Sequence, residues 1–446
     1  MPGPQTIRPT YGRWYILAMI SVMYLITYLD RVNISTAAPE IAKEFGFDKI
    51  TMGIIFSAFV WAYAIFQVPG GWMSDRFGAR PVLATIVAYW SVMTAATAAA
   101  SGSISFVVLR FLFGIGEAGA FPGATRAMQL WYPREERGFV QGITHSASRL
   151  GAAIAPPIVV LIMTNLGWRS VFYICGAVGF IWAIWWFLSY RNLPEEHRLV
   201  NSAELERIRG LDAQGNINKP VIEEKRASVP WSTLLTSPNM WAIMCAYFTY
   251  VYCLWIFLSW LPSYLVEARH FTLIKVGLFA SLPLFAGVIG DTVGGLASDW
   301  LLKKTGNTKL ARRSVAIVGL LGCAVFIVPA ALTENAYTAV YCLTGAMFFL
   351  ECTIGPSWAV PMDAGGKYSG TVSGMMNMAG NIGGALSPLV FGLLAQYGNW
   401  QAPFIVAATL LVIGAGVWAF WLDPDRSVVE KAPAEGAALK SPATAV

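Results

Sequence analysis

The chain has 446 residues, of which 56% are hydrophobic and 13% are charged, and its formal net charge is +6 at pH 7. About a quarter of the residues of a soluble domain are charged, so this composition excludes an ordinary soluble protein and indicates an integral membrane protein. The six cysteines lie in apolar segments without the paired spacing of a metal site, and we predict neither disulfides nor zinc. The first 14 residues, MPGPQTIRPTYGRW, contain no apolar core followed by a cleavage site, so we expect the first hydrophobic segment to be a permanent span.

Twelve apolar stretches are long enough to cross a bilayer as helices, which takes about 20 residues each. They cover residues 14–37, 50–73, 80–101, 104–131, 137–164, 168–190, 239–267, 272–299, 311–332, 335–360, 367–397 and 400–422. A charged stretch divides them six and six. We therefore predict an all-α membrane protein with a six-helix bundle in 1–190, a linker in 191–238, a second six-helix bundle in 239–422 and a disordered tail in 423–446.

Basic residues gather on one side of the predicted spans. The loops on that side hold Arg76, Arg80, seven Lys or Arg of the linker and the basic cluster 303–313, whereas the opposite side has only five basic residues. Because cytoplasmic loops are enriched in Lys and Arg, we expect both termini and the linker to be cytoplasmic, in the inner membrane of a bacterium. This topology explains the net positive charge, so we predict no nucleic-acid partner.

The two halves of the chain repeat each other. The stretch GGWMSD (70–75) recurs as GGLASD (294–299). Six further residues match at one constant offset: Gly138, Gly142, Gly151, Pro156, Trp168 and Phe172 correspond to Gly370, Gly374, Gly383, Pro388, Trp400 and Phe404. Two six-helix halves related as parallel repeats are typical of secondary transporters, which bind substrate near the membrane midplane between the halves.

These motifs resemble the major facilitator superfamily. The stretch GGWMSDRFGARP is similar to the signature loop between helices 2 and 3 of that superfamily. The stretches YLDRVNISTAAPEIAKEFG, RFLFGIGEAGAFPGATRAMQLWYPREERG and WLPSYL resemble its anion:cation symporter branch. That branch includes bacterial proton-coupled transporters for galactonate, glucarate and hexuronates, and the animal vesicular glutamate transporters and sialin. The resemblance covers nearly the whole chain except the linker and tail.

The signature loop suggests a gate. Asp75 near a helix end could pair with basic groups such as Arg76 and Arg80, and such a cluster can close one side of a transporter in one state and break in the other. Asp299 stands at the position of Asp75 in the second half. We assign these four residues to gating; the alternative is a turn with solvated charges.

Charged residues inside the predicted first and fourth spans are the strongest functional signal, because a charge at membrane depth costs roughly 2.5–3.5 kcal/mol. Tyr28 and Arg31 are three residues apart and share one face of a helix, while Asp30 is rotated about 100° from Arg31. Arg110 and Glu117 share a face of the fourth span. The expected depths permit a pair of Asp30 with Arg110 and place Glu117 near Arg31.

Two of these residues suit coupled transport. The planar guanidinium of Arg31 can bind a substrate carboxylate, and Glu117 could carry the coupling proton, because burial disfavours the charged form of a carboxyl group. The resemblance implies the same roles, with proton sites at Asp30 and Glu117. If protonation of Glu117 frees Arg31 for the anion, proton and substrate favour each other's binding. The alternative is a pair of ion pairs that only join the two helices.

Eight further residues are candidates for the wall of the substrate cavity: Tyr63, His145, Ser148, Arg149, Ser357, Trp358, Asn377 and Asn381. The resemblance implies substrate contacts at Tyr63, Ser357 and Trp358, although Tyr63 and Trp358 could instead serve helix packing. Asn377 and Asn381 occupy the repeat-equivalent positions of His145 and Arg149.

The chain departs from the family pattern at residues 145–149, where HSASR stands in place of the NSAQY of several relatives. The cation of Arg149 could meet a second anionic group on the substrate, such as that of a diacid, or a different carboxylate altogether. It could also pair with an acid of the protein. Glu351 and Asp291, both inside predicted spans, have no partner that the sequence assigns.

We predict a proton-coupled symporter that imports a small organic anion, with a sugar acid or related carboxylate as the leading substrate. An anion exchanger or facilitator without proton coupling, and a transporter of aromatic or dicarboxylic acids, are the alternatives. The sequence has no HExxH motif, GxSxG elbow or P-loop, so we predict no enzyme. A sensor would need a signalling domain, for which the linker and tail are too short. We expect no cofactor besides the coupling proton, and a monomer in the lipid bilayer.

Overall fold

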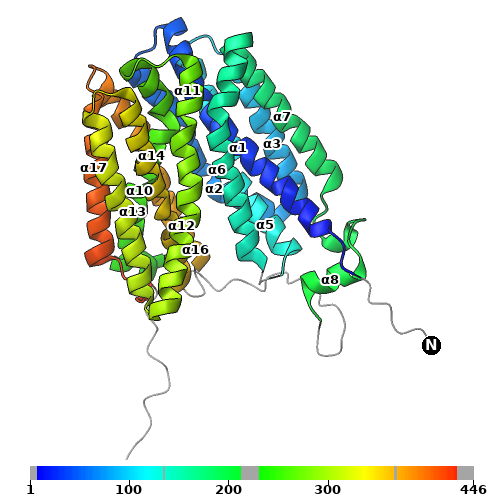
Figure 1. Cartoon of the computed structure of the whole chain (residues 1–446). Coiled ribbons are helices and arrows are strands. Elements are labelled where there is room, and N and C mark those ends of the chain that lie inside the picture. Colours follow the sequence, from blue (N-terminus) through cyan, green and yellow to red (C-terminus); the bar gives the residue numbers. More distant parts are fainter. Residues whose placement is uncertain (1–7, 134–135, 212–230, 366–368, 429–446) are drawn as a thin grey trace, which may run out of the picture.

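The computed structural model describes residues 8–133, 136–211, 231–365 and 369–428, and these residues are almost entirely helical (Figure 1). The first half contains α1 (Gly12–Phe45), α2 (Lys49–Phe77), α3 (Ala79–Thr97), α4 (Ser103–Glu117), α5 (Ala120–Trp131), α6 (Arg137–Leu166) and α7 (Trp168–Ser189). The linker contains the short η2 (Pro194–Glu196), α8 (Ser202–Arg209) and α9 (Trp231–Thr236). The second half contains α10 (Pro238–Ser263), η3 (Tyr264–Ala268), α11 (Leu273–Phe279), α12 (Ser281–Thr305), α13 (Thr308–Leu332), α14 (Ala336–Cys352), α15 (Ile354–Gly365), α16 (Ser369–Ala395), α17 (Gln401–Gly416) and η5 (Val417–Trp421).

The all-α membrane fold predicted from the sequence is confirmed. Within the described ranges, 11 helices are long and apolar enough to cross a membrane, several of them built from two consecutive elements such as α4 with α5 and α14 with α15. The remaining predicted span, 80–101, forms α3, which has 19 residues and packs beside α7 and α4 without being among the 11. Residues 212–230 of the predicted linker and 429–446 of the predicted tail lie outside the described residues.

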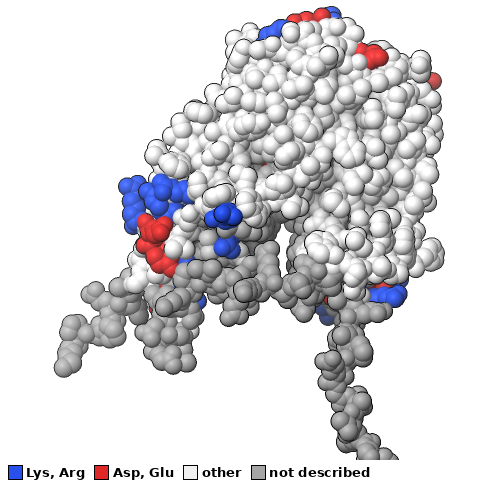
Figure 2. All heavy atoms as spheres, turned by 180° about the vertical axis from the view of Figure 1, so that it is seen from behind, with Lys and Arg blue, Asp and Glu red and all other residues white. Residues whose placement is uncertain are grey.

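The helices form two bundles, α1–α7 and α10–α17, which lie side by side in Figure 1. We call the end that carries α8 the linker end, and the opposite end, where α1 gives way to α2, the far end. Charged side chains gather at these two ends, and the surface between them is almost free of charge in the view of Figure 2. Such an uncharged belt is what a lipid bilayer requires of a protein that spans it.

Local sequence signals explain how the chain turns at the far end. Helix α1 ends at Gly46, whose φ of 66° lies in the left-handed region that glycine adopts without steric cost. The next helix begins after Asp48, whose carboxylate accepts a hydrogen bond from the Thr51 backbone N–H. Hydrogen bonds from Thr51 lower the pKa of Asp48, so the cap stays charged near neutral pH.

The two bundles are joined at the far end. Lys49 at the start of α2 pairs with Glu267 of η3 over 3.1 Å, and its backbone N–H donates to the side-chain oxygen of Gln396. About two turns deeper along α2, the Ser57 hydroxyl donates to the Ala385 carbonyl of α16 over 2.6 Å. These contacts all run from α2 in the first half to elements of the second half, and they close this end of the molecule.

The linker end is different. Gly142 of α6 and Gly374 of α16, which match each other in the sequence repeat, both face open space: a Cβ added to either would meet nothing within 4 Å among the described residues. At the far end, a Cβ on Gly53 would lie 2.6 Å from the Pro388 carbonyl oxygen across the interface. The halves therefore touch at the far end, whereas Gly142 and Gly374 near the linker end face open space.

A close approach of backbones holds the first bundle together and gives a testable expectation. A Cβ on Gly151 of α6 would lie 2.3 Å from the Leu25 carbonyl oxygen of α1, so Gly151→Ala must push two helices apart. We expect a loss of about 1–3 kcal/mol of stability, seen as a lower thermal unfolding midpoint in detergent. Gly142→Ala, on the same helix in open space, is the matched control and should leave the midpoint unchanged or raise it slightly. Equal midpoints for the two variants would contradict the close approach.

Candidate functional site

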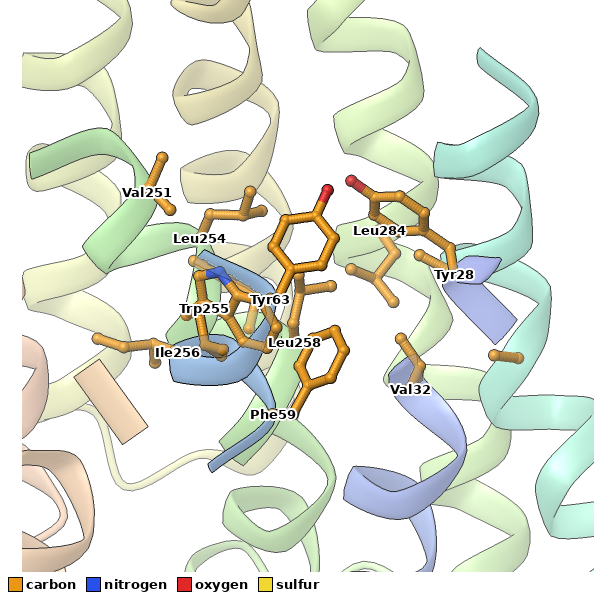
Figure 3. Packing of buried hydrophobic residues seen from close by; sticks show 14 of the residues in the cluster. Tyr28, Val32, Phe59, Tyr63, Val251, Leu254, Trp255, Ile256, Leu258 and Leu284 are labelled. Atoms are coloured by element: carbon orange, nitrogen blue, oxygen red, sulfur yellow. The ribbon is translucent and has the colours of Figure 1, made fainter. Parts of the chain in front are cut away.

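The two halves meet at mid-depth around a group of aromatic side chains. Figure 3 shows Tyr28 of α1, Phe59 and Tyr63 of α2, and Trp255 of α10 packed in this region. The guanidinium carbon of Arg31 lies 4.7 Å from the centre of the Tyr28 ring and 4.6 Å from that of Tyr63. Aromatic rings hold a guanidinium by cation–π attraction while leaving its N–H groups free to donate hydrogen bonds. Tyr28, Arg31 and Tyr63 therefore lie together, as expected from the sequence.

Arg31 forms a buried ion pair with Glu117. Its Nε atom lies 2.8 Å from Oε1 of Glu117, and the residues are 8% and 0% exposed. This contact was predicted from helix depth. The carboxylate stands at the last residue of α4, just before the interruption between α4 and α5. Arg31 Nη2 and Glu117 Oε2 are buried without a hydrogen-bond partner among the described residues, so the pair retains a donor and an acceptor for another group.

The direct pair predicted between Asp30 and Arg110 is not formed. No ion pair within 4.0 Å joins these two described residues; the Arg110 guanidinium instead lies 4.5 Å from the Phe113 ring centre and 5.0 Å from that of Phe59. Asp30 accepts a 3.5 Å hydrogen bond from Asn33 through Oδ1, and Oδ2 has no partner. Although Asp30 and Arg110 were expected at the same depth in the membrane, they do not pair, because the rings of Phe59 and Phe113 hold the Arg110 side chain. The two opposite charges still attract each other through the protein interior.

A second buried ion pair joins the two halves. Arg149 of α6 lies 3.1 Å from Glu351 of α14 through Nη2 and Oε2, and the residues are 7% and 0% exposed. The hydroxyl of Tyr250 in α10 donates to the same Glu351 oxygen over 3.1 Å and accepts from Arg149 Nη2 over 3.3 Å. In this structure the Arg149 cation thus pairs with an acid of the protein, Glu351, to which the sequence assigned no partner. No sequence pattern singles out Tyr250, which lies in a run of aromatic residues.

Two further polar links involve predicted residues. Asn377 of α16 donates from Nδ2 to Oε1 of Gln67 over 3.1 Å, and Gln67 in turn donates to the Tyr63 hydroxyl over 3.2 Å, so this chain of hydrogen bonds crosses between the halves. Trp358 of α15 donates to the Tyr247 hydroxyl over 3.1 Å. Gln67 and Tyr247 were missed by the sequence reasoning. A single amide in an apolar span was a signal for Gln67.

Other predicted cavity residues have more local roles. The hydroxyl groups of Ser148 and Ser357 donate to carbonyls of their own helices, those of His145 and Thr353. The ring of His145 lies 6.4 Å from that of Trp358, across the boundary between the halves. Asn381 is 6% exposed, and its Nδ2 has no hydrogen-bond partner in the described part of the chain.

The gating residues differ between the halves. Asp299 accepts from Arg312 Nη1 over 2.9 Å, and Asp363 of α15 lies 3.3 Å from Nε of the same arginine, so one cation links α12, α13 and α15. In the first half Arg80 donates from Nε to the Phe187 carbonyl over 2.9 Å. The Arg76 guanidinium lies 5.4 Å from the Trp72 ring centre. The side chain of Asp75 lies outside the described residues.

Known proteins resemble this chain over most of its length. Residues 20–388 and 367–445 match the Major Facilitator Superfamily. A "Probable sulfoacetate transporter SauU" of Cupriavidus necator is 45% identical over 404 residues, which cover 90% of this chain and 92% of the relative. A "Probable galactarate/D-glucarate transporter GudP" of Escherichia coli is 34% identical, covering 86% of this chain and 87% of the relative, and a "D-galactonate transporter" of Escherichia coli is 33% identical, covering 92% and 95%.

Solved structures share the fold. A bacterial homologue of the human lysosomal transporter Spinster, solved in an inward-facing and occupied conformation, superposes with a TM-score of 0.76 at 18% sequence identity over 95% of this chain and 99% of the other. The unoccupied form of that homologue gives a TM-score of 0.74 at 17% identity, over 91% and 96% of the two chains.

Proposed function

Because the chain belongs to the Major Facilitator Superfamily, and is thus a multi-pass membrane transporter related to carriers of small organic anions, we propose that it imports such an anion together with protons. Transport would proceed by alternating access, with both termini and the linker in the cytoplasm of a bacterium. The substrate we propose is a sugar acid or a related small carboxylate. The printed names of its relatives support this class, since sulfoacetate, galactarate, glucarate and galactonate are all small organic anions.

The buried Arg31–Glu117 pair carries the proposal. Arg31 is the cation available at mid-depth between the Tyr28 and Tyr63 rings, and Glu117 occupies one of its N–H groups. A proton on Glu117 would remove the charge that holds the guanidinium, and the anion would then gain a full charge-assisted contact with Arg31. Each ligand thereby raises the affinity of the other, which is the coupling that symport requires. Asp30, buried with an unpartnered oxygen one residue away, is the second candidate for a proton site.

The arrangement of the bundles supports access to the central site from the linker end. With the far end closed around Lys49 and open space beside Gly142 and Gly374 near the linker end, the central site would exchange substrate with the linker side. If the linker is cytoplasmic, as the distribution of Lys and Arg indicates, this is the state that releases substrate into the cell. The return to an outward-open state would require the far-end contacts to break.

Uptake into proteoliposomes tests the proposal. The purified full chain would be reconstituted, and uptake of radiolabelled sulfoacetate, D-glucarate and D-galactonate would be measured with and without an inwardly directed proton gradient. We expect at least one of these anions to accumulate above its external concentration with the gradient, and a protonophore to abolish that accumulation. Uptake that stops at equal concentrations despite the gradient would indicate a facilitator or exchanger and contradict proton coupling.

A further inference from the structure

Two buried guanidinium groups lie against one aromatic ring. The guanidinium carbon of Arg31 is 4.7 Å from the centre of the Tyr28 ring and that of Arg149 is 5.8 Å from it. The two carbons are therefore no farther apart than the sum of these distances, 10.5 Å. Two cations this close repel each other in an interior of low dielectric, so their neighbourhood favours negative charge.

The two arginines have matching surroundings. Each binds a glutamate that is 0% exposed, Glu117 for Arg31 and Glu351 for Arg149. Both glutamates stand where a spanning helix is interrupted: Glu117 is the last residue of α4, before α5, and Glu351 is the last but one residue of α14, before α15. Interrupted helices at mid-membrane depth are typical of substrate sites in transporters.

Each pair also leaves buried polar atoms unsatisfied. Within the part of the chain that the structure describes, Arg149 Nε and Glu351 Oε1 lack a hydrogen-bond partner, as do Arg31 Nη2 and Glu117 Oε2. Leaving a buried donor or acceptor unpaired is costly, so each of these groups calls for a partner. The second pair therefore has the same spare bonding capacity as the first.

From these observations we propose that Arg149 forms a second anion subsite and that the substrate is a small dianion bridging Arg31 and Arg149, such as a diacid or a carboxylate that also bears a sulfonate. This inference deepens the proposed function and rests on it. One anionic group takes the place of Glu117 at Arg31, and the other takes the place of Glu351 at Arg149. The upper limit on the separation of the two cations restricts the substrate to anionic groups joined by a short chain.

Charge balance couples the second subsite to a proton. Glu351 and Asp291 both act electrostatically on Arg149. The other titratable groups that interact with this pair are Tyr28, His145, Tyr247, Tyr250 and Cys352. Two acids thus surround one cation, so a second anionic group enters only when Glu351 takes up a proton. The hydroxyl of Tyr250 can still hydrogen-bond the neutral carboxyl.

The exchange of partners would also loosen the contact between the halves. Arg31 and Arg149 both belong to the first half, whereas Glu351 belongs to the second. A dianion held by the two arginines replaces a bond between the halves by bonds within one half. Substrate binding then favours states in which the halves move, as a ligand must do if it is to shift a conformational equilibrium.

Binding of matched anion pairs tests the second subsite. Affinities of the purified full chain would be measured by calorimetry for D-glucarate against D-gluconate and for sulfoacetate against acetate. We expect at least one dianion to bind roughly tenfold or more tightly than its monoanionic partner, since one charge-assisted hydrogen bond contributes about that factor. In the double variant Arg149→Gln/Glu351→Gln, which removes both charges of the ion pair, the preference should disappear, while the monoanion should still bind at Arg31.

The controls distinguish failure of the second subsite from failure of the proposed function as a whole. The double variant Glu44→Gln/Arg169→Gln removes an exposed ion pair of 2.7 Å at the far end and should keep the preference for dianions. A preference that survives in Arg149→Gln/Glu351→Gln, or a parent chain that binds monoanions at least as tightly, would overturn the second subsite alone. If none of the four anions binds the parent more tightly than it binds Arg31→Gln, the proposed function falls and this inference falls with it.

Discussion

Replacing Arg31 with glutamine is expected to weaken binding of the transported anion by about 100-fold and to reduce its uptake to background. The guanidinium is 8% exposed, lies over the Tyr28 and Tyr63 rings, and has a free Nη2 donor. Two hydrogen bonds to a charged group contribute about 3 kcal/mol together, which corresponds to that loss. Calorimetry with sulfoacetate and D-glucarate on the purified chain measures the affinity, and proteoliposome uptake measures transport.

Two further variants make the result of Arg31→Gln specific. Arg31→Gln leaves the Glu117 carboxylate buried without its cation, so the double variant Arg31→Gln/Glu117→Gln is needed as well. We expect the double variant to bind the anion as weakly as Arg31→Gln does, but to regain thermal stability. Arg31→Lys keeps the charge but loses the planar fork, so we expect intermediate affinity. Affinity within threefold of the parent in the double variant would show that the anion binds elsewhere.

The parts of the molecule that follow from local periodicity were predictable from the sequence. The apolar runs of the sequence predicted the membrane-spanning helices. The three-residue spacing of Tyr28 and Arg31 predicted that these side chains lie on the same face of a helix. Helix rise per residue gave the correct depth for Glu117 opposite Arg31. The exception among the spans is α3, which has 19 residues and is not among the 11 described helices that are long and apolar enough to cross a membrane.

Contacts that depend on how the two halves dock were not predictable. The Arg149–Glu351 pair and its partner Tyr250 come from three helices far apart in sequence, and nothing in a single helix indicates their approach. Depth along a helix does not fix the rotation of a long side chain, which is why Arg110 lies on the rings of Phe59 and Phe113 and does not contact Asp30. A sequence can thus identify buried charged residues more reliably than it can predict which of them form ion pairs.

Glu117→Gln is expected to abolish uphill uptake of the anion while leaving exchange across the membrane intact. Glutamine has nearly the shape of glutamate and can still accept a hydrogen bond from Arg31 Nε, but it carries no charge and takes up no proton. Arg31 would then be open to the anion at any pH, so binding of the anion would no longer require a proton. The proton gradient could therefore no longer drive accumulation of the anion. Proteoliposomes measure both activities, uptake against a concentration gradient with an acidic exterior and counterflow of labelled against unlabelled anion without one.

The matched control for this variant is Glu44→Gln, which removes another glutamate that pairs with a cation, but within the first half at the far end, where the side chain is 41% exposed. It should keep uphill uptake, because a partly exposed pair contributes little and no step of the coupling depends on it. Intact uphill uptake by Glu117→Gln would exclude this residue as the essential proton carrier and move that role to Asp30, whose buried Oδ2 has no partner. Loss of both uphill uptake and counterflow would mean instead that the charged Arg31–Glu117 pair is needed to move the halves, since binding of the anion to a free Arg31 would remain.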